Sequence, residues 1–113
     1  MQEANQADKS DIEVEKTLSH AFMMSGKYNE AEDTLIDMLT LAPGRAAAWV
    51  DLGLVYAKKG NSGAAVASFA NGYRFSDNRQ KTIEYLNGLV EKATDNSVRE
   101  AAKRALGVTS TIP

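Results

Sequence analysis

The sequence predicts an all-α fold in which antiparallel helix pairs stack side by side, and three observations support this prediction. Apolar residues recur three, four and seven positions apart, as do Trp49, Leu52 and Tyr56, so they share one face of a helix. Glycine-containing turns interrupt these stripes, which predicts short helices joined in pairs. The pattern also repeats after thirty-four residues, as shown by the pairs Leu18 and Leu52, Phe22 and Tyr56, Gly26 and Gly60, Ala31 and Ala65, and Leu35 and Phe69.

The composition is that of one globular protein. The 113 residues are 43% hydrophobic, enough for a core, and 25% charged, too few for wholesale disorder. The chain has no cysteine, which excludes disulfides, thiol catalysis and zinc sites built on cysteine. No apolar run approaches the roughly 20 residues of a membrane helix, and the start of the chain lacks the features of a signal peptide. We therefore expect a soluble protein with no membrane span, in the cytoplasm, or in the periplasm if a signal peptide has been removed.

The repeat also predicts the domain organisation. We expect a single helical domain over residues 11–107, which lies between a disordered N-terminal tail (1–10) and a C-terminal tail (108–113). Within the domain, two full repeats and one degenerate repeat occupy residues 12–45, 46–79 and 80–107.

The first repeat begins with a predicted capping box. Ser10 and Glu13 have the spacing at which each side chain binds a free backbone N–H at the start of a helix. Gly26 ends the first helix of this pair. Pro43 stops the second helix, after an apolar stripe formed by Tyr28, Ala31, Leu35 and Met38.

The second repeat carries the most specific pattern, a Trp-x-x-Leu-Gly-x-x-Tyr run followed by Ala-x-x-x-Phe. Its positions are Trp49, Leu52, Gly53, Tyr56, Ala65 and Phe69. This pattern resembles the tetratricopeptide repeat, a helix–turn–helix unit of thirty-four residues. The resemblance implies a right-handed α-solenoid that binds other proteins, similar to small bacterial repeat proteins. We expect Trp49 to be wedged between helices of successive repeats.

The third repeat is degenerate, and we expect it to cap the stack. Ser97 and Glu100 form a second predicted capping box. The helix that follows should bury one side and end at Gly107, a fitting C-cap residue. Its buried side is predicted to contain Val98, Ala101, Ala102, Ala105 and Leu106.

The sequence contains no pattern that indicates an enzyme. His20 is the only histidine, and it has no metal-ligand or catalytic spacing to other residues. The Gly60–Gly63 turn lacks the Gly-Lys-Ser/Thr of a phosphate-binding loop. We therefore expect no catalytic residue, no metal site and no cofactor.

The resemblance implies a concave groove lined by the first helix of each repeat. A stripe separate from the core stripe lies on each of these helices. Several of its residues are apolar, which favours a partner segment over plain solvent contact, and methionines suit such surfaces. Alternatively, the last helix or the N-terminal tail covers them. The predicted groove residues are Met23, Met24, Val50, Leu54, Tyr85, Lys16, His20, Asp51 and Lys81.

A carboxylate-binding groove, as in co-chaperones of this family, is not expected. Lys16 and Lys81 match the basic positions of that clamp. Asp51, however, stands where the clamp has an asparagine, and its charge would repel a carboxylate. His20 and Tyr85 also depart from the clamp residues.

These observations predict a protein-interaction module, an adaptor or chaperone in a larger assembly, whose apolar groove binds a protein or peptide segment. The alternative is a structural subunit that self-associates through its ends into a homo-oligomer. Residues 1–37 contain nine acidic residues and three lysines, whereas the remainder contains six acidic and ten basic residues. No basic stripe with interleaved aromatics appears, so nucleic acid is not an expected partner.

Overall fold

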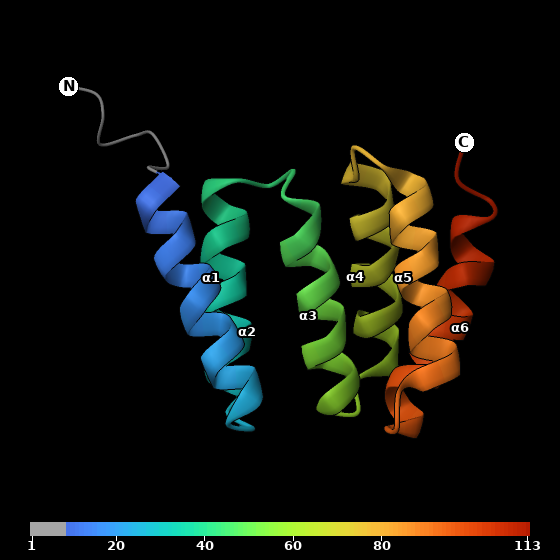
Figure 1. Ribbon diagram of the computed structural model, residues 1–113, viewed down its shortest axis with the longest axis horizontal. Coiled ribbons are helices and arrows are strands. Elements are labelled where there is room, and N and C mark those ends of the chain that lie inside the picture. Colours follow the sequence, from blue (N-terminus) through green and yellow to red (C-terminus); the bar gives the residue numbers. More distant parts are fainter. Residues whose placement is uncertain (1–8) are drawn as a thin grey trace.

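The computed structural model describes residues 9–113, with side chains described from Glu13 onward. This part of the chain forms six α-helices and no β-strand, which confirms the all-α prediction. Consecutive helices run in opposite directions and pack as three pairs along the long axis of the molecule (Figure 1). The helices are α1 (Lys9–Met24), α2 (Tyr28–Leu41), α3 (Ala46–Lys58), α4 (Ser62–Phe75), α5 (Arg79–Lys92) and α6 (Asn96–Thr109).

Two glycines permit the turns inside the first two helix pairs. Gly26 has a φ of 75° and Gly60 a φ of 81°, a left-handed conformation that glycine adopts without a steric penalty. Both positions follow the last turn of a helix and let the chain reverse direction. The predicted ends of the first helix in each full repeat are thereby confirmed.

The predicted helix ends near the termini need correction. The first eight residues of the predicted disordered tail lie outside the described residues, but α1 already begins at Lys9, so Ser10 lies inside the helix and is not its cap. At the start of α6 the N-cap is Asp95, whose carboxylate accepts a hydrogen bond from the Ser97 backbone N–H. Gly107 does not end α6, because the helix continues to Thr109, which is buried.

The core consists of two clusters that share α3. The first lies between α2 and α3 and contains Ala31, Leu35, Met38, Leu39, Ala48, Leu52 and Val55. The second joins α3 to α4, α5 and α6 and contains Ala57, Ala65, Phe69, Leu86, Val98, Ala101, Ala102 and Ala105. Because α3 buries residues on two sides, it is the central helix of the stack.

Small residues allow the helices to approach one another closely. A Cβ atom placed on Gly53 of α3 would lie 2.6 Å from the fully buried ring of Phe69 on α4. Ser19 of α1 stands at the equivalent position one repeat earlier and is also completely buried. At Gly53, the small residue of the repeat therefore marks the contact between the two helices of a pair.

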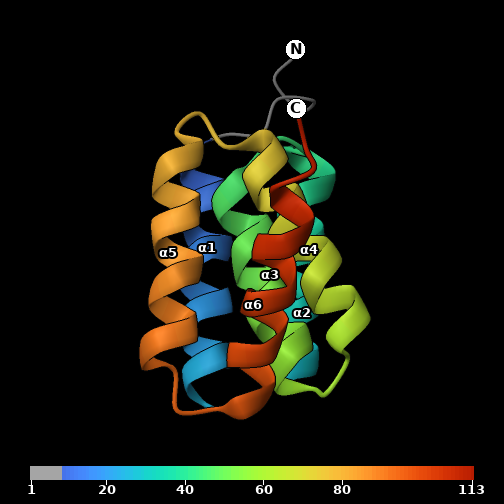
Figure 2. The same cartoon turned by 90° about the vertical axis from the view of Figure 1, so that its right-hand side faces the viewer.

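The third pair keeps the length of a repeat but not its packing. α6 packs against both α5 and α4, and α4 and α6 lie side by side in Figure 2. α6 buries Val98, Ala101, Ala102 and Ala105 in the second core cluster. The equivalent positions in α2, two repeats earlier, include Glu30, Asp33 and Asp37, which are exposed. The alanines of α6 permit this close approach, so α6 buries a face that α2 leaves in water.

Candidate interaction groove

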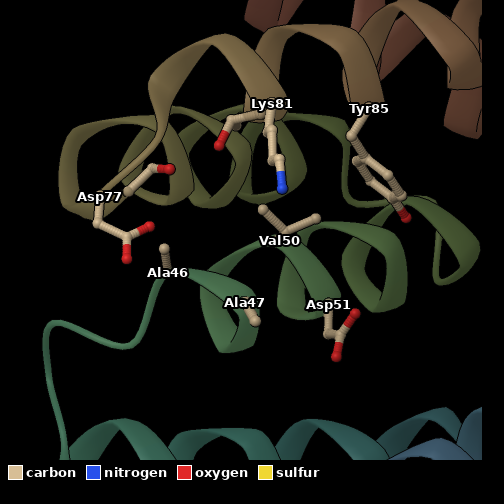
Figure 3. A pocket seen from close by; sticks show the side chains of 9 residues that line it. Ala46, Ala47, Val50, Asp51, Asp77, Lys81 and Tyr85 are labelled. Carbon is tan, nitrogen blue, oxygen red and sulfur yellow. The ribbon is translucent and has the colours of Figure 1, made fainter.

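A surface depression lies between α3 and α5 and contains four of the predicted groove residues (Figure 3). Its volume is about 370 Å³. Small side chains of α3 form its floor, and the side chains of Lys81 and Tyr85 project from α5. The lining residues are Ala46, Ala47, Val50, Asp51, Ser76, Asp77, Lys81, Thr82 and Tyr85. We call this depression the α3–α5 groove.

The groove exists because of how α5 is held. α5 packs chiefly on α6 and to a lesser extent on α4, rather than against α3. Ala46 and Ala47, at the start of α3, have side chains too short to fill the space that remains. α6 lies against α4 and does not cover this groove, whereas the first eight residues of the chain fall outside the description.

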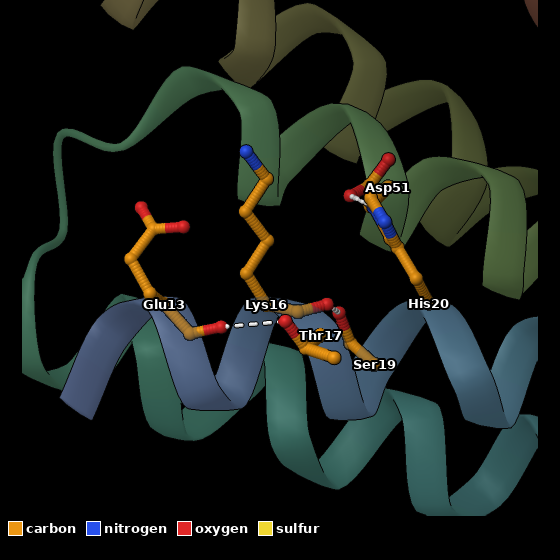
Figure 4. A network of polar contacts seen from close by, with 6 residues as sticks. All are labelled: Glu13, Lys16, Thr17, Ser19, His20 and Asp51. Carbon is orange, nitrogen blue, oxygen red and sulfur yellow. Dashed lines mark hydrogen bonds and ion pairs between the residues drawn. The ribbon is translucent and has the colours of Figure 1, made fainter. Parts of the chain in front are cut away.

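Asp51 connects the groove to the first repeat. Its carboxylate lies 3.1 Å from Nε2 of His20, so an ion pair or hydrogen bond links α3 to α1 (Figure 4). Burial raises the pKa of Asp51, and this effect exceeds the opposing influence of His20 and Lys16. Of the two polar groove residues predicted on α1, His20 therefore contacts α3 directly, whereas Lys16 acts on Asp51 through its charge.

Tyr85 combines an apolar ring with partial burial. Its side chain is 42% exposed in the open groove. Burial is also the main cause that raises the pKa of its hydroxyl group, with a smaller contribution from the charge of Asp51. A half-buried tyrosine can contact an apolar group with its ring while its hydroxyl reaches water or a polar partner.

The structure separates the predicted groove residues into groups. Val50, Asp51, Lys81 and Tyr85 line the α3–α5 groove, and His20 adjoins it through Asp51. Leu54 is half-buried against the second core cluster and lines another depression, with Leu89 and Val98. The two methionines lie elsewhere: Met23 packs against the first core cluster, and Met24 is 89% exposed at the end of α1.

Sequence reasoning missed the contribution of the α4–α5 connection to the groove. Ser76 and Asp77 of this connection line the groove, as does Thr82 of α5. Helical periodicity places residues on a helix face, but it gives no signal for the path of a connection between helices.

A second apolar depression lies on α2 and α3. It is lined by Ile36, Leu39, Thr40, Trp49, Leu52 and Tyr56. The ring of Trp49 stacks on Phe75 of α4 with centroids 6.3 Å apart, and its indole N–H donates a hydrogen bond to the Pro43 carbonyl. Trp49 thus packs against the first core cluster, which includes residues of the preceding repeat, while part of the Trp49 side chain lies at the surface. This position agrees with the predicted structural role.

In the described part of the chain, no three histidine, cysteine or carboxylate side chains gather at distances that could hold a metal ion. Over the same residues, no helix combines the length and the apolar character needed to cross a membrane. Comparisons with protein-family models, with curated proteins and with solved structures find no match for this chain.

Proposed function

We propose that this protein is an interaction module, an adaptor that binds a segment of another protein in the α3–α5 groove. The observation that carries the proposal is the open groove itself, in which the half-exposed ring of Tyr85 faces an apolar floor that includes Val50. Aromatic residues in such positions dominate the energetics of many protein interfaces. The thirty-four-residue repeat and its paired helices further support a right-handed solenoid of the tetratricopeptide type.

The chemistry of the groove defines the segment that it would bind. Ala46, Ala47 and Val50 offer a shallow apolar floor, suited to one or two apolar side chains of an extended or helical segment. Lys81 is exposed at the rim, where it can pair with a carboxylate of the partner. Asp51 is engaged by His20 and disfavours an anionic group at the floor.

Affinity capture with quantitative mass spectrometry tests this proposal. The wild type is compared with Tyr85→Glu, which places a charge where an apolar side chain of the partner would be desolvated. Ile36→Glu is the matched control, because Ile36 is also 42% exposed but lies on α2, outside the groove. We expect a protein that the wild type and Ile36→Glu retain and that Tyr85→Glu loses, with both variants melting close to the wild type.

The expected loss of affinity is at least tenfold, since a central aromatic contact typically contributes about 2 kcal/mol or more. Retention of every captured protein by folded Tyr85→Glu would contradict binding in this groove. Equal losses from Tyr85→Glu and Ile36→Glu would likewise show that the effect is unspecific.

A further inference from the structure

The helix α1 exposes a ridge of apolar side chains. Val14 is 58% exposed and Leu18 is 45% exposed. One repeat later the same positions are Ala48 and Leu52, which are 1% and 3% exposed because α2 of the preceding repeat covers them. The ridge of Val14 and Leu18 is therefore a helix-packing face of the repeat with no helix on it among the described residues.

The opposite end of the molecule contains a complementary cleft between α4 and α6. Its volume is about 370 Å³, and its lining is mainly apolar and small. Val108 of α6 is 39% exposed at this cleft. Figure 1 places α1 and α6 at opposite ends of the long axis, and Figure 2 shows α4 beside α6 at the second end. The lining residues are Gly63, Val66, Ala67, Ala70, Asn71, Arg74 and Val108.

The two ends carry opposite charges. On the α1 ridge, Glu13 precedes Val14, and its side chain is 65% exposed although it approaches Arg45. α2 also carries the exposed acidic residues Glu30, Asp33 and Asp37. They belong to the helix pair of α1 and α2, which lies at the same end of the molecule as the ridge (Figure 1).

Arginines flank the cleft at the other end. Arg74 lines the cleft at the end of α4. Arg104 of α6 reaches the start of α4, where its Nη1 lies 3.5 Å from Oγ of Ser62. An apolar ridge on an acidic helix pair thus matches an apolar cleft that contains Arg74 and has Arg104 nearby.

We propose that a second copy of this chain docks its α1 ridge into the α4–α6 cleft, so that molecules associate head to tail. The contact joins two different surfaces, so a docked pair of molecules still has one free ridge and one free cleft. Such a heterologous contact that does not close into a ring extends with concentration instead of stopping at a dimer. The contact lies away from the α3–α5 groove, so self-association and partner binding are independent.

Sedimentation velocity from about 10 µM to about 1 mM, a range that reaches weak interfaces, tests the proposal. Leu18→Glu blocks the ridge and Val108→Glu blocks the cleft, and each substitution should raise the dissociation constant about tenfold or more. An equimolar mixture of the two variants should form a 1:1 dimer and nothing larger, because one intact ridge and one intact cleft remain. Ile36→Glu is the control and should associate as the wild type does. Raising NaCl from about 0.1 M to about 0.5 M should weaken association.

Circular dichroism melting verifies that each variant is folded. If Leu18→Glu or Val108→Glu does not fold, Val14→Glu on the ridge and Arg74→Glu in the cleft replace them. A wild type that stays monomeric up to about 1 mM would overturn the proposal. So would association that survives Leu18→Glu. If Val108→Glu associates normally and the mixture does not restore Leu18→Glu, the ridges of two copies pair with each other, and the proposed cleft is wrong.

Discussion

Replacing Gly53 with alanine tests the packing between α3 and α4. The added Cβ would lie 2.6 and 2.7 Å from two carbons of the Phe69 ring, distances at which atoms must shift. Phe69 is completely buried, so its ring cannot swing into solvent. Overpacking of this kind costs about 1–3 kcal/mol, and the rigid ring places this site near the upper end. Alanine recovers about 1 kcal/mol through its higher helix propensity. The net loss is therefore about 2 kcal/mol, equivalent to a fall in Tm of about 10 °C.

Gly107→Ala is the matched control for this measurement. Gly107 lies inside α6, and a Cβ added there meets no atom within 4 Å. The same substitution should therefore raise stability by up to about 1 kcal/mol. Thermal unfolding followed by circular dichroism compares both variants with the wild type. A Gly53→Ala protein that melts at or above the wild-type temperature would refute the close contact between the two helices. A destabilised Gly107→Ala would indicate that this glycine ends the helix after all.

Three further predictions concern single side chains. Trp49→Ala should lower the free energy of unfolding by about 2–3 kcal/mol because the stack on Phe75 and the contact with the first core cluster are lost. The loss is smaller than for a fully buried tryptophan, since part of Trp49 lies at the surface. Denaturant titration measures it, and a stability equal to that of the wild type would contradict the structural role of Trp49. Asp95→Ala should cost about 1 kcal/mol at neutral pH through loss of the helix cap. Lys58 and the cap lower the Asp95 pKa below its usual 3.8, so this contribution is present above about pH 4 and is lost as the pH falls through the lowered pKa. A cost that does not decrease as the pH falls below 3.8 would contradict the prediction. Burial raises the Asp51 pKa, so the stability that this carboxyl group contributes at low pH is lost as the pH rises through its folded-state pKa. The stability of Asp51→Asn relative to the wild type should therefore increase over that pH range. A stability difference that does not change with pH would contradict this prediction.

The repeat was predictable from the sequence because it depends on local periodicity. The paired helices follow from the spacing of residues such as Leu52 and Phe69, and the turns follow from Gly26 and Gly60, whose positive φ angles favour glycine. The orientation of α6 could not be predicted from the sequence. Its apolar stripe was predicted from Val98 to Leu106. No local signal shows that α6 packs against α4 as well as α5, or that its buried face is rotated relative to the buried face of α2.

The groove was only partly predictable for the same reason. Val50 and Tyr85 were placed on the correct helix faces, and the structure brings them together. Leu54 is on the same helix as Val50, one turn later, yet the end of α5 and the start of α6 lie beside it, so that it lines a different depression. The depth of burial along one stripe depends on how a neighbouring helix tilts and ends, which helical spacing does not encode.

Site-specific photo-crosslinking tests binding in the α3–α5 groove most directly. A photoreactive phenylalanine analogue replaces Tyr85 in one protein and Ile36 in the other, two positions that are equally exposed on different surfaces. After illumination in the cells that produce the protein, mass spectrometry identifies the attached peptides. Binding in the groove predicts a discrete partner segment with apolar side chains attached at position 85 and absent at position 36. Attachment of the same products at both positions, or of a discrete partner at position 36 alone, would contradict it.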